Sequence, residues 1–260
     1  MNRVAFVLVA AAALSSCDAP SSSSSSPSSS TAAPSAEALT AVQAQLSKRL
    51  AALHDFDVTG TIVAAGGQTL GFRYAMQQPS FAAGELLSPT GQRTRAFVFD
   101  GKVLAVIDEA THTITRTDLS KNEEQMLLTL HEVFSPFVCE GWRPPLVRPT
   151  GTTAVVVGDT VELTVPINAA GVVASTVVLG SDGSFVSKRT TGDGGVLLTG
   201  TTVEANVVDA PTGLKFPTRW QQQDGATTAT TTLSSWTVNR GIAADRFSTA
   251  VPPGFTERAP

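Results

Sequence analysis

The stretch LGFRYAMQQPSFAAGELLSPTGQRTRAFVFDGKVLAVIDEATHTITRTDL, residues 70–119, decides the fold of this chain. Its first seven residues alternate large apolar side chains with small or polar ones, and a period of two indicates a β-strand. The large side chains share one face of this strand and are Leu70, Phe72, Tyr74 and Met76.

The rest of the stretch continues as short strands separated by turn residues. We expect these strands at residues 81–87, 95–99, 103–107 and 113–117. Phe97 and Phe99 share a face, and Asp100-Gly101 provides a tight hairpin, because glycine tolerates the positive φ that such turns need. The predicted antiparallel meander has one apolar face and an opposite face of Arg, Thr and Gln, so its apolar face requires a cover.

A helix that directly follows the meander is the predicted cover. Ser120 and Glu123 form a capping box at its start, and Pro136 ends it. At ~1.5 Å per residue, about fourteen residues span roughly 21 Å, enough to cross several strands. Its apolar stripe consists of Met126, Leu127, Leu130, Val133 and Phe134. We predict a hydrophobic cavity and lid built from Phe72, Tyr74, Met76, Phe97, Phe99, Met126, Leu130 and Phe134.

The first sixteen residues are interpreted as a bacterial lipoprotein signal peptide. Arg3 precedes an apolar run at residues 4–13, and the following Leu14-Ser-Ser-Cys17 resembles the lipobox in which the cysteine is lipidated. We therefore expect Cys17 to carry the lipid, palmitate among its acyl chains, and residues 17–34 to form a Ser/Pro-rich tether. An ordinary secretory signal with an incidental cysteine is the alternative. A transmembrane anchor is disfavoured, because the apolar run is shorter than the ~20 residues that span a bilayer.

Residues 35–260 read as one α+β domain. Ser35 is a plausible N-cap for a first helix, whose expected apolar stripe includes Leu46, Leu50 and Leu53, with Arg49 facing out. Strand follows strand from residue 155 to residue 238, and no Pro/Gly-rich linker divides them. A long antiparallel sheet with two helices and a single core is the simplest architecture.

Composition and motifs give no support for nucleic-acid binding, a metal site, a cofactor or catalysis. The net charge of −4 and the pI near 5.4 lack the basic footprint of a nucleic-acid-binding protein. His54, His112 and His131 have no metal-ligand spacing. Asp100, Asp108 and Glu109 are more typical of hairpin turns than of an acid–base pair. Cysteine lipidation would leave Cys139 alone, which indicates a buried small side chain rather than a disulfide.

Three segments in order resemble the bacterial lipoprotein-carrier superfamily of LolA/LolB type, which includes lipid-binding lipoproteins and RseB-like regulators. They are DFDVTGTI at residues 55–62, the hairpin of residues 100–115 that begins DGKVL, and DRFSTAVPPGF at residues 245–255. The resemblance implies an incomplete antiparallel β-barrel, or half-barrel, with an N-terminal helix and a lid helix covering the concave face. Soluble carriers have an Arg-Pro pair after the second strand, where this chain has Gln78 and Pro79.

The resemblance also implies binding rather than catalysis. The expected function is a membrane-tethered lipoprotein that holds a hydrophobic ligand, either lipid or the acyl chains of a lipoprotein, for transport or localisation at the cell envelope. The alternative is an envelope interaction or regulatory protein that uses the same fold to bind a protein partner without ligand transfer. In both cases the folded domain lies outside the cytoplasm, in the periplasm, and the anchoring membrane, inner or outer, stays open.

Overall fold

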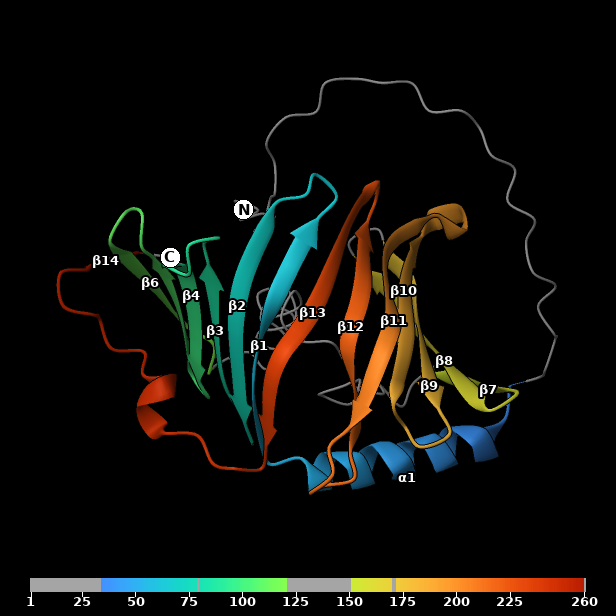
Figure 1. The fold of residues 1–260 in the computed structure, drawn as a ribbon. Helices are drawn as coiled ribbons and strands as arrows, with labels where there is room; N and C mark the ends of the chain where they lie inside the picture. Colours follow the sequence, from blue (N-terminus) through green and yellow to red (C-terminus); the bar gives the residue numbers. More distant parts are fainter. Residues whose placement is uncertain (1–33, 79, 121–150, 170–171, 260) are drawn as a thin grey trace.

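The computed structural model describes residues 34–78, 80–120, 151–169 and 172–259. These residues form one helix, two short 3-10 helices and a single sheet of fourteen strands (Figure 1). The helical elements are α1 (Ala36–Ala52), η1 (Asp193–Gly195) and η2 (Ala244–Phe247). The strands are β1 (Asp55–Ala64), β2 (Thr69–Gln77), β3 (Phe81–Leu87), β4 (Arg93–Asp100), β5 (Val103–Asp108), β6 (Thr113–Asp118), β7 (Thr153–Val157), β8 (Thr160–Ala169), β9 (Val172–Gly180), β10 (Phe185–Gly192), β11 (Leu197–Val208), β12 (Lys215–Asp224), β13 (Thr227–Val238) and β14 (Thr256–Arg258).

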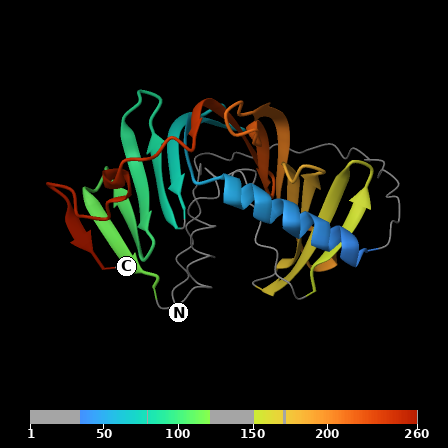
Figure 2. The same ribbon diagram turned by 90° about the horizontal axis from the view of Figure 1, so that it is seen from below.

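The sheet is a curved, unclosed arch. Its strand order is β14-β6-β5-β4-β3-β2-β1-β13-β12-β11-β10-β9-β8-β7, so β14 and β7 are the two edges. Neighbouring strands are antiparallel except β14 and β6, which are parallel. Phe56 of β1 lies opposite Val238 of β13, so the middle of the sheet joins the two ends of the domain. Seen from below, the strands enclose a concave side (Figure 2).

This arch confirms the predicted strands and the half-barrel sheet. Each strand expected from residue 70 to residue 119 is present, and its ends differ from the prediction by at most two residues. The predicted lid helix with Met126, Leu130 and Phe134 lies outside the described residues, as do Cys17 and the tether. The lid therefore stays a prediction.

Helix α1 runs along one end of the arch, from β7 toward β1 (Figures 1 and 2). The Ser35 hydroxyl accepts a hydrogen bond from the amide of Ala38 at 3.2 Å and so confirms the predicted N-cap. The predicted apolar stripe is wrong in the last turn of α1, where Arg49 is buried and Leu50 is 41% exposed. At 3.6 residues per turn, the buried face of α1 is centred on Ala38, Val42 and Leu46, and position 49 lies much closer to that centre than position 50. The aliphatic part of Arg49 can occupy an apolar position.

The main core lies on the concave side of the sheet. Its buried side chains come from α1 and from most strands between β1 and β13. The rings of Phe56 and Tyr74 are 5.5 Å apart, and Trp220 and Leu163 continue the same cluster into the C-terminal half. The concave face is therefore apolar on both halves of the arch.

A second buried cluster on the opposite, convex face corrects the prediction of a single core. Small and branched apolar side chains of β2–β6 lie there among the predicted Arg, Thr and Gln; they are Ala75, Ala83, Ala96, Val98, Ala105, Ile107 and Ile114. The C-terminal segment, residues 239–258, covers them. Its Phe247 packs on Phe81 with ring centroids 5.6 Å apart. The sequence does not show this cluster for two reasons. Alanine between polar residues is only a weak indication of a buried face, and the segment that covers it is more than a hundred residues away in the sequence.

Candidate functional site

Five of the predicted cavity residues lie together on the concave face. Phe72, Tyr74 and Met76 come from β2, and Phe97 and Phe99 come from β4. Strand β3 runs between β2 and β4 and places small residues opposite two of the large side chains on each of these strands. Gly84 lies opposite both Tyr74 and Phe97, and Ala82 lies opposite both Met76 and Phe99. Gly84 has no side chain and Ala82 has only a methyl group, so both leave room for the larger side chains of β2 and β4.

These five side chains are all deeply buried. Their exposed fractions run from 0% for Phe99 to 7% for Met76, and all belong to the main core. The lid partners that the sequence predicts for them, Met126, Leu130 and Phe134, lie outside the described residues. The structure thus places the five residues together, and their role in ligand binding stays a prediction.

Gly60 of β1 makes the close packing of Phe72 possible. It lies opposite Phe72 in the β1–β2 pair and at a bulge in the β1–β13 pair. A Cβ atom at residue 60 would lie 2.8 Å from the Phe72 ring and 2.3 Å from the carbonyl oxygen of Thr232. Only glycine leaves room for both neighbours.

Gln78, which the sequence resemblance aligns with the arginine of soluble carriers, joins the end of β2 to α1. Its side-chain amide donates hydrogen bonds to the carbonyl oxygens of Leu50 (2.9 Å) and Leu53 (2.6 Å). The last carbonyls of a helix have no partner within the helix, so these bonds cap the C-terminus of α1. In this chain the residue therefore has a capping role.

A polar cluster ties the turn between α1 and β1 to the end of β13. The Asn239 side chain donates to the carbonyl oxygen of Ala52 at 2.7 Å and accepts from the amide of His54 at 2.8 Å. Asn239 itself has a positive φ of 54°. The buried Asp55 carboxylate accepts from the amides of Arg240 and Gly241. These bonds fix the point where the C-terminal segment leaves the sheet.

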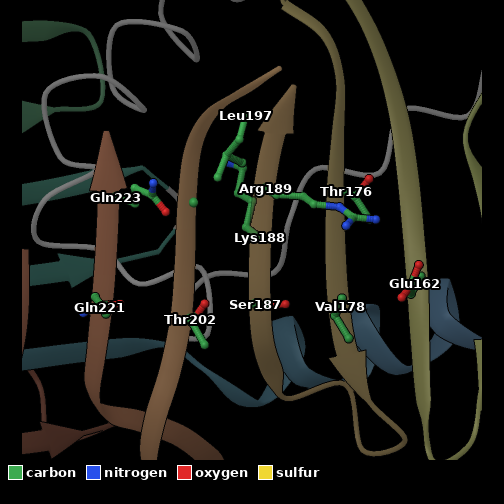
Figure 3. Close-up of a pocket in the computed structure, with 11 residues that line it drawn as sticks. Glu162, Thr176, Val178, Ser187, Lys188, Arg189, Leu197, Thr202, Gln221 and Gln223 are labelled. Carbon is green, nitrogen blue, oxygen red and sulfur yellow. The ribbon is translucent and has the colours of Figure 1, made fainter. Parts of the chain in front are cut away.

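The convex face of the C-terminal half carries a polar cavity of about 330 Å³ (Figure 3). Hydroxyl and amide side chains form much of its wall, including Thr176, Thr202, Gln221 and Gln223. Figure 3 shows Arg189 reaching across this surface toward β9, with α1 behind the sheet. The cavity is therefore separated from the concave aromatic residues by the sheet itself.

A larger cavity of about 680 Å³ lies on the convex face of the N-terminal half. It lies between β1 and β3–β5 on one side and the C-terminal segment on the other. The sequence does not reveal this cavity, because its walls come from segments far apart in the chain. The five concave residues line neither of the two cavities.

Asp100 and Asp108, two of the acidic residues considered for acid–base chemistry, accept hydrogen bonds that stabilise turns. Burial acts to raise the pKa of Asp100, but hydrogen bonds from the amides of Val103 and Lys102 and from the Thr249 hydroxyl outweigh it and lower the pKa. Asp108 accepts from the amide of Thr111 in the next turn.

No grouping of three or more His, Cys, Asp or Glu that could hold a metal ion occurs in the part of the chain that the structure describes. In that same part, no helix has the length and apolar character needed to cross a membrane.

No protein-family model matches the chain, and no curated protein does. Several solved structures are similar in fold. A LolA superfamily protein from Nitrosomonas europaea is 17% identical with a TM-score of 0.51, over 80% of this chain and 97% of that one. An outer membrane lipoprotein-sorting protein domain from Vibrio parahaemolyticus is 10% identical with a TM-score of 0.52, over 81% of this chain and 97% of that one. A DUF1329 family protein from Desulfovibrio piger is 10% identical with a TM-score of 0.57, with the same two coverages.

Proposed function

From the LolA-type fold of this chain, we propose that it is a lipid-anchored protein of the bacterial cell envelope that binds acyl chains on its concave face. The observation that supports this most is the apolar concave face, where aromatic side chains of β2 and β4 lie on either side of the small residues of β3. Each methylene removed from water contributes ~0.8 kcal/mol, so an acyl chain held there gains affinity mainly from its length. The ligand is a lipid or the acyl chains of another lipoprotein, carried or retained for transport or localisation.

We also propose that Cys17 carries the anchor. The lipobox-like Leu14-Ser-Ser-Cys17 supports it, and residues 18–34 would act as the tether. A flexible chain of this length has a mean reach of ~23 Å, so the domain can stand off a membrane while remaining attached. The folded part then lies outside the cytoplasm.

Metabolic labelling with a fatty-acid probe tests the anchor. The full chain is expected to incorporate the probe and to fractionate with membranes, whereas Cys17→Ser is expected to remove the label, because no acyl acceptor remains at that site. Cys139→Ser is the matched control and should be labelled like the unchanged protein. An unlabelled native protein would exclude the anchor.

Titration with a fluorescent fatty-acid analogue tests the binding proposal. The full chain with Cys17→Ser, which has no acyl chains of its own, is expected to take up the probe saturably. If residues 120–136 form the predicted lid, Leu130→Ala should weaken uptake with little change in the midpoint of thermal unfolding. Gln221→Ala, on the convex polar cavity, is the control and should change neither quantity.

An absence of probe uptake together with a loss of stability in Leu130→Ala supports the second candidate, an envelope protein that binds a protein partner and transfers no ligand. That candidate is favoured by the deep burial of the five concave residues, which line neither cavity. It predicts no saturable uptake of the probe, and a loss of about 2–5 kcal/mol in unfolding free energy for Leu130→Ala, as for other buried leucine truncations.

A further inference from the structure

The larger convex cavity has the dimensions of a small-molecule site. Its volume of about 680 Å³ lies inside the range of roughly 300–1,000 Å³ typical of ligand pockets. Its floor is formed by small sheet residues, Ala83, Gly84 and Ala96, which leave space above the strands. Ile242 and Pro252 of the C-terminal segment contribute apolar atoms from the other side.

The covering segment is fixed along its length, so the cavity is built into the fold. At its start, the Asp55 carboxylate holds the amides of Arg240 and Gly241. In its middle, Phe247 is buried in the convex cluster, and the Thr249 hydroxyl donates to Asp100 at 2.9 Å. At its end, β14 pairs with β6. A ligand would therefore meet walls that are already in place.

The basic residues of this cavity have acidic partners. Arg246 lies 3.3 Å from the carboxylate of Glu85. Arg93 lies 3.7 Å from Glu85, and 2.5 Å from the carboxylate of Glu109. Both arginines of the cavity therefore have their charge balanced by a carboxylate, by Glu85, which lines the cavity, and by Glu109, which does not.

Among the described residues, Asp57 is the partly buried charged group of the cavity that has no such partner, whereas Asp245, which also lines the cavity, is exposed. Within the residues that the structure describes, the Asp57 carboxylate has neither a hydrogen bond nor an ion pair, although it lines the cavity and is only partly exposed. Burial raises the pKa of Asp57, and this effect exceeds the opposing influence of Arg246 and Arg73. A partly buried carboxylate without a partner gains most from a ligand that donates hydrogen bonds and carries positive charge.

We infer that this cavity binds a small molecule with an apolar body and a protonated amine, and that the ammonium group pairs with Asp57 while the body lies over Ala83 and Ala96. The site is separate from the proposed acyl-binding face, because the two lie on opposite faces of the sheet. The convex cavity would give the chain a second ligand, a protonated amine, and this inference does not depend on what the concave face binds.

Calorimetric titration of the full chain with Cys17→Ser tests this inference with three probes of equal length. n-Hexylamine is expected to bind at one saturable site at pH 7. Hexan-1-ol should bind about ten-fold more weakly, because it lacks the charge, and hexanoate more weakly still, because Asp57 repels it.

Substitutions then assign the binding to this cavity. Asp57→Asn should weaken hexylamine about ten-fold and leave hexan-1-ol unchanged. Ala96→Phe should abolish binding of both by filling the floor. Ala250→Phe fills the cavity from the exposed C-terminal segment and serves if Ala96→Phe fails to fold. The matched control is Glu162→Gln, the same carboxylate-to-amide change in the other cavity, which should have no effect.

The inference is overturned if hexylamine shows no saturable binding, if hexanoate binds as tightly, or if Asp57→Asn leaves hexylamine affinity unchanged. Uptake of the fluorescent fatty-acid analogue by Asp57→Asn separates the two proposals. It should match that of the unchanged protein, so failure of either proposal leaves the other standing.

Discussion

Replacement of Gly60 by alanine is expected to lower the free energy of unfolding by about 3 kcal/mol or more. The new Cβ atom would lie 2.3 Å from the Thr232 carbonyl oxygen and 2.8 Å from the Phe72 ring. The first of these atoms belongs to the backbone of a paired strand, so β13 would have to move. Overpacking of this kind usually costs roughly 1–3 kcal/mol, and a backbone clash places Gly60 at the upper end. Urea unfolding followed by circular dichroism measures the effect.

Gly66→Ala is the control for this prediction. Residue 66 has no neighbouring atom within 4 Å of an added Cβ and is not among the glycines with positive φ. Its substitution should change the free energy of unfolding by no more than about 0.5 kcal/mol. Equal effects at the two positions would contradict the close packing of β1, β13 and Phe72.

Replacement of Asn239 by alanine is expected to cost about 2–4 kcal/mol of unfolding free energy. The change removes the hydrogen bonds to Ala52 and His54, each contributing about 1 kcal/mol, and leaves their backbone groups without these partners. It also places a residue with a Cβ but no compensating side-chain bond at φ 54°, which adds roughly 1–2 kcal/mol. Thermal and urea unfolding of the variant measure the total loss of unfolding free energy.

Asn239→Gly separates the two contributions. Glycine accepts the positive φ but cannot make the side-chain hydrogen bonds, so this variant should be more stable than Asn239→Ala by about 1 kcal/mol. Asn206→Ala, at an exposed position of β11, is the control and should lie within about 0.5 kcal/mol of the unchanged protein. If Asn239→Ala behaved like Asn206→Ala, the polar cluster would have no part in holding the C-terminal segment.

Both stability predictions concern residues whose importance the sequence pattern does not show. Gly60 lies in an otherwise ordinary alternating strand, and Asn239 follows a strand as many turn residues do. A substitution at either position changes contacts with partners that are between about ten and two hundred residues away. The residue pattern of a single segment carries no information about such distant partners.

The sequence by itself determined the local elements of this protein and the sharing of one face by Phe72, Tyr74, Phe97 and Phe99. A period of two in side-chain polarity indicates the two faces of a strand. A pair such as Asp100-Gly101 indicates a hairpin, and a capping residue such as Ser35 indicates the start of a helix. All of these depend on residues close together in the chain. They were sufficient to predict the antiparallel meander and its apolar face.

Only the tertiary structure decided how these elements meet. It joined β1 to β13 and placed the C-terminal segment over the alanines of β2–β5. It also gave Gln78 and Asn239 their backbone partners and formed the cavity beside Asp57. Each of these features unites segments distant in sequence, and alanine, glycine or a single carboxylate is compatible with many environments. Their roles follow from the neighbours that the folded chain brings within contact distance, because burial and hydrogen bonding depend on position in space rather than on order along the chain.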